Sequence, residues 1–213
     1  MRAVGILGGE GYPNGELLLW VNLVDFYAIA DGGIKYFKAL NSAPLFVIGD
    51  IDSEGHMPET KGFKYIKVVD QNSSDCDKLL FELRERGFNE VILVCGHGGR
   101  LDHQLDILNS LARNSFKGPI IYPQEIVYVL SPGYYSWFNI SLSTRVSLLP
   151  MGVVKLNSYS GFEWDIPNKS LNQPDNVSLS NRTVQNSISL EIESGYIVMT
   201  IERKPGEVPS WFS

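Results

Sequence analysis

Residues 91–103 read VILVCGHGGRLDH: an apolar run, a glycine-rich turn and the beginning of a helical pattern. Val91–Cys95 is typical of a buried strand, and Leu101–Asn114 has the apolar spacing of an amphipathic helix. The same alternation extends upstream, through the helical pattern of Asp75–Arg86, to four further apolar runs. These runs are Ala3–Leu7, Phe26–Ala30, Leu45–Ile48 and Tyr65–Val69. Strands that alternate with helices predict an N-terminal α/β domain with a parallel sheet.

Beyond Pro119 the chain changes to one β-rich run after another. Ser187–Glu193 alternates residue by residue, as a strand with one solvated face does. Glycines in Pro132-Gly133, Met151-Gly152 and Ser194-Gly195 predict turns. The other runs are Ile120–Tyr122, Ile126–Leu130, Tyr134–Phe138, Arg145–Leu149, Val153–Leu156, Gly161–Ile166 and Tyr196–Ile201. We therefore expect α/β plus all-β, with a parallel-sheet domain over residues 1–118 and an antiparallel β-sandwich or small barrel over residues 119–213.

The charge balance limits the classes of ligand. Among 213 residues, 18 are Lys or Arg and 24 are Asp or Glu, which gives a net charge of −6. This argues against a nucleic-acid surface, but a metal ion could supply the positive charge that a phosphorylated ligand needs. The longest apolar stretch, Leu17–Val24, is interrupted by Asn22 and is too short for a membrane span. With two cysteines and no secretory pattern, we expect reduced thiols and a cytoplasmic protein.

Carboxylates and glycines follow four of the expected parallel strands. In an open parallel sheet, ligands bind beyond the carboxyl ends of the strands, so these segments should be neighbours. The segments are Asp31-Gly32-Gly33, Gly49-Asp50-Ile51-Asp52-Ser53, Asp70 to Asp75, and Gly96 to His103.

Asp50 and Asp52 alternate with Ile51, so in an extended chain both carboxylates point the same way. Joined by a third acid, they would suit the oxygen-seeking Mg²⁺. The alternative is an ordinary turn with capping acids. Asp75 could likewise be a helix cap, and Lys78 lies on the same side of the helix one turn later. A lysine there suits a phosphate, although a surface lysine is the commoner case.

The turn between Gly96 and Arg100 has backbone N–H groups, at Gly98 and Gly99, that could hold a phosphate with help from Arg100. It is neither a Walker loop nor a dinucleotide-binding fingerprint. Asp102 could be a general base, a substrate anchor or the salt-bridge partner of Arg100. His97 and His103 have no partners at a metal-ligand spacing, but either could touch a ligand from the loop.

The order of these motifs resembles that of the thiamine pyrophosphokinase family. Asp-Gly-Gly, Gly-Asp-x-Asp-Ser, Ser-Asp-x-x-Lys and Gly-x-x-Gly-Arg-x-Asp-His follow one another within residues 30–103. In the second half, Ser160–Trp164 is similar to the family's Gly-Leu-Lys-Trp segment, and Ser180-Asn181 to its Ser-Asn segment.

The resemblance implies a homodimer that moves a pyrophosphoryl group from ATP to thiamine and releases AMP. It implies that Asp50, Asp52 and Asp75 hold Mg²⁺ and that Lys78 and Arg100 neutralise phosphate charge. The ligand-lining residues that it implies are Asp31, Gln71, Gly98, Gly99, Asp102, Trp164, Ser180 and Asn181. In the family, the tryptophan and the serine come from the neighbouring subunit. Trp164 would stack on the thiamine rings; the alternative is that it packs inside the β domain.

The match departs from the family at three positions. Asn72 stands where an acid is frequent, Ser74 replaces a threonine, and Glu163 replaces a lysine. The lost acid puts the number or affinity of metal ions in doubt. Two other functions compete: a related transferase that acts on another alcohol, and a non-catalytic small-ligand binder with the same fold.

Overall fold

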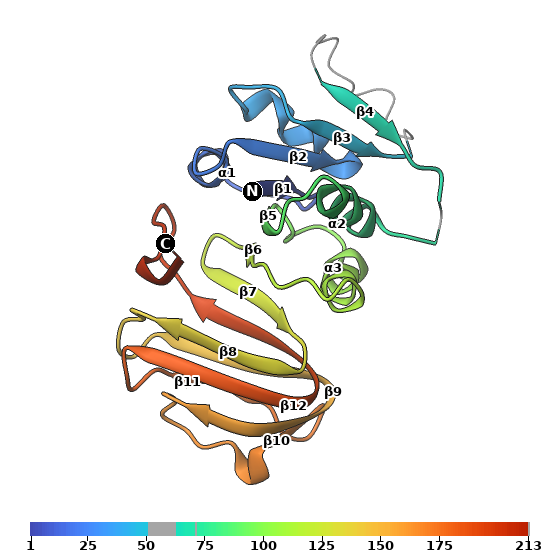
Figure 1. Cartoon of the computed structure of the whole chain (residues 1–213). Helices are drawn as coiled ribbons and strands as arrows, with labels where there is room; N and C mark the ends of the chain where they lie inside the picture. Colours follow the sequence, from blue (N-terminus) through green and yellow to red (C-terminus); the bar gives the residue numbers. More distant parts are fainter. Residues whose placement is uncertain (51–62, 71, 213) are drawn as a thin grey trace. The chain divides into compact units, whose positions relative to one another are not determined.

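The computed structural model describes residues 1–50, 63–70 and 72–212. The chain divides into two compact units, Met1–Pro123 and Gln124–Ser213 (Figure 1). No helix of the described residues is both long and apolar enough to cross a membrane.

The first unit is built on a parallel sheet with strand order β6-β5-β1-β2-β3-β4. Each neighbouring pair in this order runs parallel. The strands are β1 (Arg2–Ile6), β2 (Phe26–Ala30), β3 (Phe46–Gly49), β4 (Lys64–Lys67), β5 (Glu90–Val94) and β6 (Ile120–Ile121). The predicted mixture of helices and strands is thus confirmed. β6 lies beside β5 in this sheet, whereas the sequence pattern grouped it with the second half.

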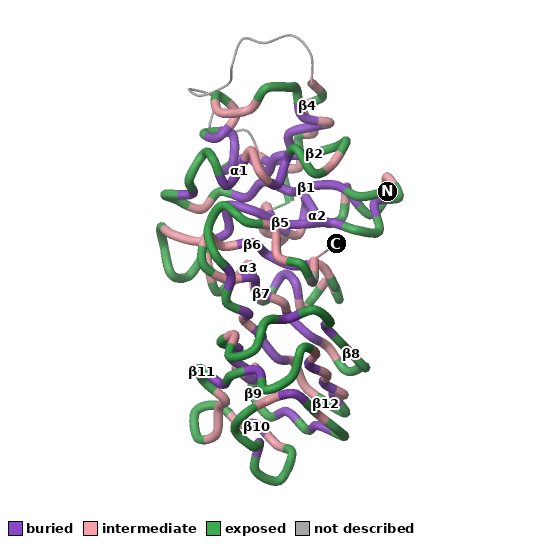
Figure 2. The backbone as a smooth tube through the Cα atoms, turned by 90° about the vertical axis from the view of Figure 1, so that its left-hand side faces the viewer, coloured by how far each residue is buried: buried purple, intermediate pink, exposed green. Residues whose placement is uncertain are grey.

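Helices connect these strands and cover the sheet. They are α1 (Asn14–Val21), the 3₁₀ helix η1 (Asp31–Ala39), α2 (Asp75–Glu85) and α3 (Leu101–Arg113). α2 packs on β2 and β3 and beside α3, while α1 packs beside η1. Four consecutive residues are buried in each of β1, β2, β3 and β5 (Figure 2). Burial without alternation means that both faces of the sheet are covered, as the near-continuous apolar runs indicated.

The strand order contains a switch point. From β1 the chain moves outward through β2, β3 and β4, then returns to place β5 on the other side of β1. The connections that leave β1 and β5 therefore diverge to opposite sides. Such a point opens a crevice at the carboxyl ends of the strands, where ligands bind in folds of this kind.

The second unit is antiparallel and is centred on two long strands. Its strands are β7 (Glu125–Leu130), β8 (Gly133–Phe138), β9 (Arg145–Ser160), β10 (Ser170–Asn172), β11 (Ser178–Arg182) and β12 (Ser187–Glu202), with short 3₁₀ turns η3 (Pro167–Lys169) and η4 (Ser210–Phe212). β12 pairs with β9, and its two halves pair with β8 and β7; β9 also pairs with β10 and β11. Buried residues of these strands, such as Leu148, Leu190 and Met199, share one apolar core.

Two predicted turns are bends inside strands. Met151-Gly152 lies within β9 and Ser194-Gly195 within β12, so each pair of predicted short strands is one long strand. Gly152 and Gly195 both have φ of +86°, and the β9–β12 register shifts around Ser194. A glycine in this conformation accommodates an extra residue as a bulge, so the strand bends but continues.

The predicted strand Gly161–Ile166 is also different in the structure. Gly161 has φ of +87°, and the segment retains one isolated bridge, between Phe162 and Thr183. A left-handed residue at Gly161 takes the chain out of the strand direction. The Glu163 N–H still donates to the Arg182 carbonyl, but those of Trp164 and Ile166 donate to the side chains of Asn181 and Tyr159. Trp164 lies in this irregular segment.

Candidate active site

A cavity of about 530 Å³ lies at the switch point of the first unit. Its walls come from the segments after β1, β2, β3, β4 and β5 and from the first turns of α2 and α3. Four segments that the sequence predicted to be neighbours thus meet here, among the described residues. The volume is in the range of small-ligand sites, and two helix N-termini favour an anion.

Two glycine-containing loops form the floor between β1 and β5. The backbone N–H of Gly9 donates to the Cys95 carbonyl at 2.7 Å, and that of Glu10 donates to the His97 carbonyl at 2.8 Å. A Cβ on Gly98 would lie 2.2 Å from the Glu10 carbonyl oxygen, and Gly98 has φ of +79°. Only glycine fits this close approach of two backbones. Sequence reasoning missed the loop after β1, although Gly8-Gly9-Glu10 repeats the glycine-and-acid signal of the other strand ends.

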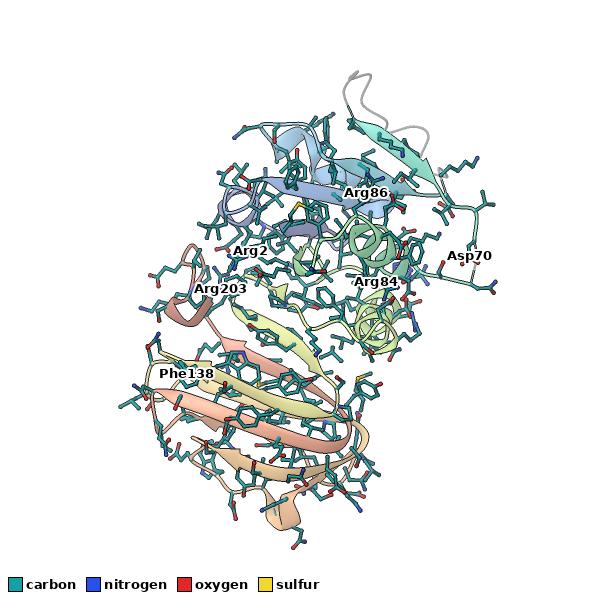
Figure 3. All side chains as sticks on the ribbon, viewed as in Figure 1. Arg2, Asp70, Arg84, Arg86, Phe138 and Arg203 are labelled. Carbon is teal, nitrogen blue, oxygen red and sulfur yellow. The ribbon has the colours of Figure 1, made fainter. Side chains whose placement is uncertain are left out.

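Four acids that follow strands line the cavity: Glu10, Asp50, Asp70 and Asp75. Asp70 lies in the connection between β4 and α2 (Figure 3). Burial raises the pKa of Asp75; the positive charge of Lys78 opposes this shift, and the charges of Asp31 and Asp50 add to it. The carboxylates at this edge therefore repel one another. A bound cation would relieve that repulsion.

The described residues contain no group of three His, Cys, Asp or Glu side chains arranged to hold a metal ion. Asp52, the third predicted Mg²⁺ ligand, lies outside the described residues, as does Gln71. Asp31 is buried against Gly49 and accepts a weak hydrogen bond from the Tyr65 hydroxyl at 3.4 Å.

Lysines supply positive charge to the cavity. Lys78 is only 7% exposed, and its Nζ lies 3.6 Å from Asp75 Oδ1. A buried ammonium group at this distance from a carboxylate retains donors for a further anionic partner. Lys35, which the sequence analysis did not identify, also lines the cavity and donates to the Gly8 carbonyl at 2.8 Å. Its position depends on the 3₁₀ turn of η1, for which no local motif gave a signal.

Arg100 and Asp102 are paired at the entrance to α3. Arg100 Nε donates to Asp102 Oδ1 at 3.0 Å, and a second bond joins the other guanidinium and carboxylate atoms. Arg100 lines the cavity, and both side chains are exposed. The hydrogen bonds from Arg100 lower the pKa of Asp102 to about 2. Of the three roles considered for Asp102, the ion pair is therefore present in the structure.

The histidines of the glycine-rich turn differ in their surroundings. His97 packs between the rings of Tyr12 and Tyr122, with centroids 5.4 and 5.3 Å away. Its burial lowers the pKa of the imidazole. His103 lines the cavity, together with Gln104 and Ile107 from the same face of α3.

In the second unit, Trp164 is 50% exposed and its backbone is held by one side chain. The Trp164 N–H donates to Asn181 Oδ1 at 3.0 Å, and Asn181 Nδ2 donates to the Trp164 carbonyl at 2.9 Å. Asn181 is 1% exposed and also accepts from the Arg182 N–H. Trp164 therefore does not pack in the core, but the side chain that fixes it does.

Ser180 and a hollow of about 150 Å³ flank this tryptophan segment. The hollow is lined by Trp164 together with apolar residues such as Pro167, Leu171 and Leu179. Ser180 is exposed, has φ of +54°, and donates its N–H to Ser147 Oγ at 3.0 Å. The described side chains of the predicted site thus fall into two groups, one in each unit.

The catalytic-domain model of thiamin pyrophosphokinase matches residues 18–122, and the vitamin B1 binding-domain model of the same enzyme matches residues 139–197. Thiamin pyrophosphokinase 1 of Caenorhabditis elegans is 24% identical over an alignment of 194 positions that covers 84% of this chain and 79% of that protein. Thiamine pyrophosphokinase 2 of Arabidopsis thaliana is 28% identical over an alignment of 233 positions, gaps included, that covers 94% of this chain and 86% of that protein.

Solved structures share the fold. Thiamin pyrophosphokinase of Geobacillus thermodenitrificans superimposes with a TM-score of 0.77 at 20% identity, over 96% of this chain and 98% of that one. The yeast enzyme gives a TM-score of 0.71 at 19% identity, over 94% and 86% of the two chains. The resemblance found in the sequence motifs is thus confirmed. Because the two domain models match in order and together span most of the chain, this protein belongs to the thiamin pyrophosphokinase family.

Proposed function

We propose that this protein transfers the pyrophosphoryl group of ATP to the hydroxyl group of thiamine, giving thiamine diphosphate and AMP. One observation carries the proposal: the catalytic-domain and vitamin B1 binding-domain models match consecutive parts of this chain. The part matched by the first model includes much of the wall of the acidic cavity. In this reaction the thiamine oxygen attacks the β-phosphorus in line while charge builds on the phosphoryl oxygens. Catalysis then consists mainly of positioning and charge neutralisation.

Asp50, Asp52 and Asp75 are the proposed Mg²⁺ ligands. The donors fit this ion, because Mg²⁺ prefers carboxylate oxygens and the raised pKa of the partly buried Asp75 reflects, after burial itself, repulsion from Asp31 and Asp50. When bound, Mg²⁺ would neutralise the phosphate oxygens of ATP. Lys78 and Arg100 add positive charge on either side, and the N–H groups of Gly98 and Gly99 donate to phosphate oxygens.

Asp102 is assigned an orienting role near the thiamine hydroxyl. A carboxylate with a pKa of about 2 is a poor proton acceptor at neutral pH. The loose transition state of phosphoryl transfer also demands little base catalysis. Asp102 therefore holds Arg100 and the attacking hydroxyl in place, and Asp31 and Gln71 complete the lining of the ligand site.

Thiamine binding is assigned to the second unit of a partner subunit in a homodimer. The partner subunit's Trp164 would stack on the cationic thiazolium, and the partner subunit's Ser180 would donate a hydrogen bond. The half-exposed indole beside a small hollow of mixed polar and apolar lining supports this assignment. A cytoplasmic location and a sandwich arrangement of the second unit belong to the same proposal; the shared core and the paired bulges support the sandwich.

Ligand protection against thermal unfolding tests the proposed function directly. A non-hydrolysable ATP analogue should raise the melting temperature in a concentration-dependent way with Mg²⁺ and much less with EDTA. Thiamine should give a separate increase. In Asp75→Asn, the Mg²⁺-dependent part should disappear and the thiamine part should remain. Protection by nucleotide and Mg²⁺ but by no thiamine would favour a transferase for another alcohol, and no protection by either ligand would contradict the proposal.

A further inference from the structure

The first turn of α2 carries two residues of the proposed phosphate site, Asp75 and Lys78. The start of this helix is fixed by a capping box. The Asp77 N–H donates to Ser74 Oγ at 3.2 Å, and the Ser74 N–H donates to Asp77 Oδ2 at 3.0 Å. Two otherwise unpaired backbone N–H groups are satisfied in this way, so the turn has a defined geometry.

The capping box is tied to the last turn of α3. Arg113 Nη2 donates to Asp77 Oδ2 at 2.8 Å, and Asn114 Nδ2 donates to Asp77 Oδ1 at 2.7 Å. The Oγ atoms of Ser74 and Ser110 are 2.9 Å apart. Asp77 therefore links the two helices through hydrogen bonds from Ser74, Arg113 and Asn114.

Arg113 also reaches an acid of the cavity wall. The same Nη2 atom lies 3.2 Å from Asp106 Oδ1 and 2.9 Å from Ser110 Oγ. Asp106 lines the cavity, which already contains several carboxylates. Arg100, a cavity-lining cation, is engaged with Asp102. Without Arg113, both Asp77 and Asp106 would lack their guanidinium partner close to the place proposed for ATP phosphates.

We infer that Arg113 and Asp77 form a positioning pair for the phosphate site: they hold the turn that carries Asp75 and Lys78 against α3, and Arg113 neutralises Asp106. The inference rests on the proposed function. Neither member of the pair lines the cavity, so the pair acts through residues that do. Small displacements of positioned groups reduce rates strongly, and a misplacement of about 1 Å can cost about 100-fold.

The primary test is steady-state kinetics of Arg113→Met with Mg·ATP and thiamine varied separately. Loss of the positive charge should raise the KM for Mg·ATP by roughly tenfold, because the turn that carries Asp75 and Lys78 loses its tie to α3, and should leave the KM for thiamine unchanged. Arg113→Lys should have a KM for Mg·ATP close to that of wild type. All three contacts of Arg113 come from one nitrogen atom, and the ammonium group of lysine has three donors.

Arg86→Met is the matched control. Arg86 pairs with Glu82 at the opposite end of the same helix, with Nε 2.8 Å from Oε1, and lies outside the cavity wall. This variant removes an arginine ion pair from α2 without touching the capping box. It should lower the melting temperature and leave both KM values at the wild-type level. An equal KM for Mg·ATP in Arg113→Met and Arg86→Met would overturn the inference.

Two more variants cover the case in which Arg113→Met does not fold. Asp77→Asn keeps the shape of the side chain but places an amide group opposite the Asn114 donor. It should therefore also raise the KM for Mg·ATP and leave that for thiamine unchanged. An unchanged KM for Mg·ATP would overturn the inference. The double variant Arg113→Met/Asp106→Asn should bind ATP more tightly than Arg113→Met, because the Asp106 carboxylate that lost its partner is no longer there.

Calorimetric binding of a non-hydrolysable ATP analogue distinguishes a failure of the proposed function from a failure of the positioning pair. If wild type binds no nucleotide, the proposed function fails. If wild type binds with Mg²⁺ and Arg113→Met binds equally well, the positioning pair alone is refuted.

Discussion

The cavity of the first unit and the Trp164 segment of the second are supported in opposite ways. The cavity is a cluster of charges, and the turn that carries Asp75 is held by ion pairs and a capping box. The tryptophan is a single large side chain outside any regular strand, held by the neutral amide of Asn181. Charged supports make the first site sensitive to pH, salt and metal, whereas the second should respond mainly to the presence and placement of one ring.

Asp75→Asn should have the largest effect, because it removes a carboxylate that we propose as a Mg²⁺ ligand. We expect kcat to fall by about 100- to 1,000-fold, the usual scale for loss of one preorganised electrostatic group. The fold should be unchanged, since the substitution is isosteric and the ion pair that Asp75 forms with Lys78 is long, at 3.6 Å. Turnover and circular dichroism measure the two properties. Near-normal turnover would remove Asp75 from the metal site.

Trp164→Ala should have a smaller and selective effect on the other side of the comparison. Loss of stacking on a cationic ring should weaken thiamine binding by ~1–2 kcal/mol. Calorimetry with thiamine and with an ATP analogue would show the selectivity, and Trp164→Phe should retain most of the affinity. Unchanged thiamine affinity together with a lower melting temperature would mean that the ring serves packing only.

Asn181→Ala sharpens the comparison by removing the support but not the ring. The variant leaves the Trp164 N–H and carbonyl without their partner, so stability should fall by about 1–3 kcal/mol. Thiamine binding should weaken severalfold in the wild-type background and by no further amount in the Trp164→Ala background. Additive losses of affinity in the double variant would show that Asn181 contributes independently of Trp164.

The pH dependence should give the smallest effect, confined to the first unit. Because the pKa of Asp75 is raised in the folded protein, its ionisation destabilises the fold as pH rises through that pKa. Without Mg²⁺, Asp75→Asn should therefore be more stable than wild type at neutral pH and no more stable below the ordinary aspartate pKa. Urea unfolding at several pH values measures this difference. A difference in the free energy of unfolding between Asp75→Asn and wild type that is the same at all pH values would contradict a raised pKa of Asp75.

Metal binding should move the same titration. If Asp75 holds Mg²⁺ as proposed, the ion competes with the proton for this carboxylate, so higher Mg²⁺ should shift the acid limb of the rate profile to lower pH. Trp164→Ala should leave that limb unchanged.

Several regular elements of the first unit could be predicted from periodicity alone. The β2 strand, Phe26–Ala30, has the predicted bounds, and α2 and α3 begin at the predicted residues, Asp75 and Leu101. A run of apolar residues or a capping pattern is a local signal, so a single sequence contains it.

What the sequence did not reveal depends on contacts between distant segments. Met151-Gly152 and Ser194-Gly195 are residue pairs typical of turns. Only the pairing of β9 with β12 on both sides of each glycine makes Gly152 and Gly195 bulges. Lys35 reaches the cavity because η1 forms a 3₁₀ turn against the β1 loop, and Asn181 supports Trp164 across 17 residues of chain. Such pairings follow from the assembled fold, so motif spacing could indicate the site but not its supports.

The most direct test of the account is the identity of the products when purified protein is given ATP, Mg²⁺ and thiamine. Pyrophosphoryl transfer predicts AMP that depends on thiamine and equals the thiamine diphosphate formed. Formation of ADP, or no thiamine-dependent turnover of ATP by folded protein, would contradict it.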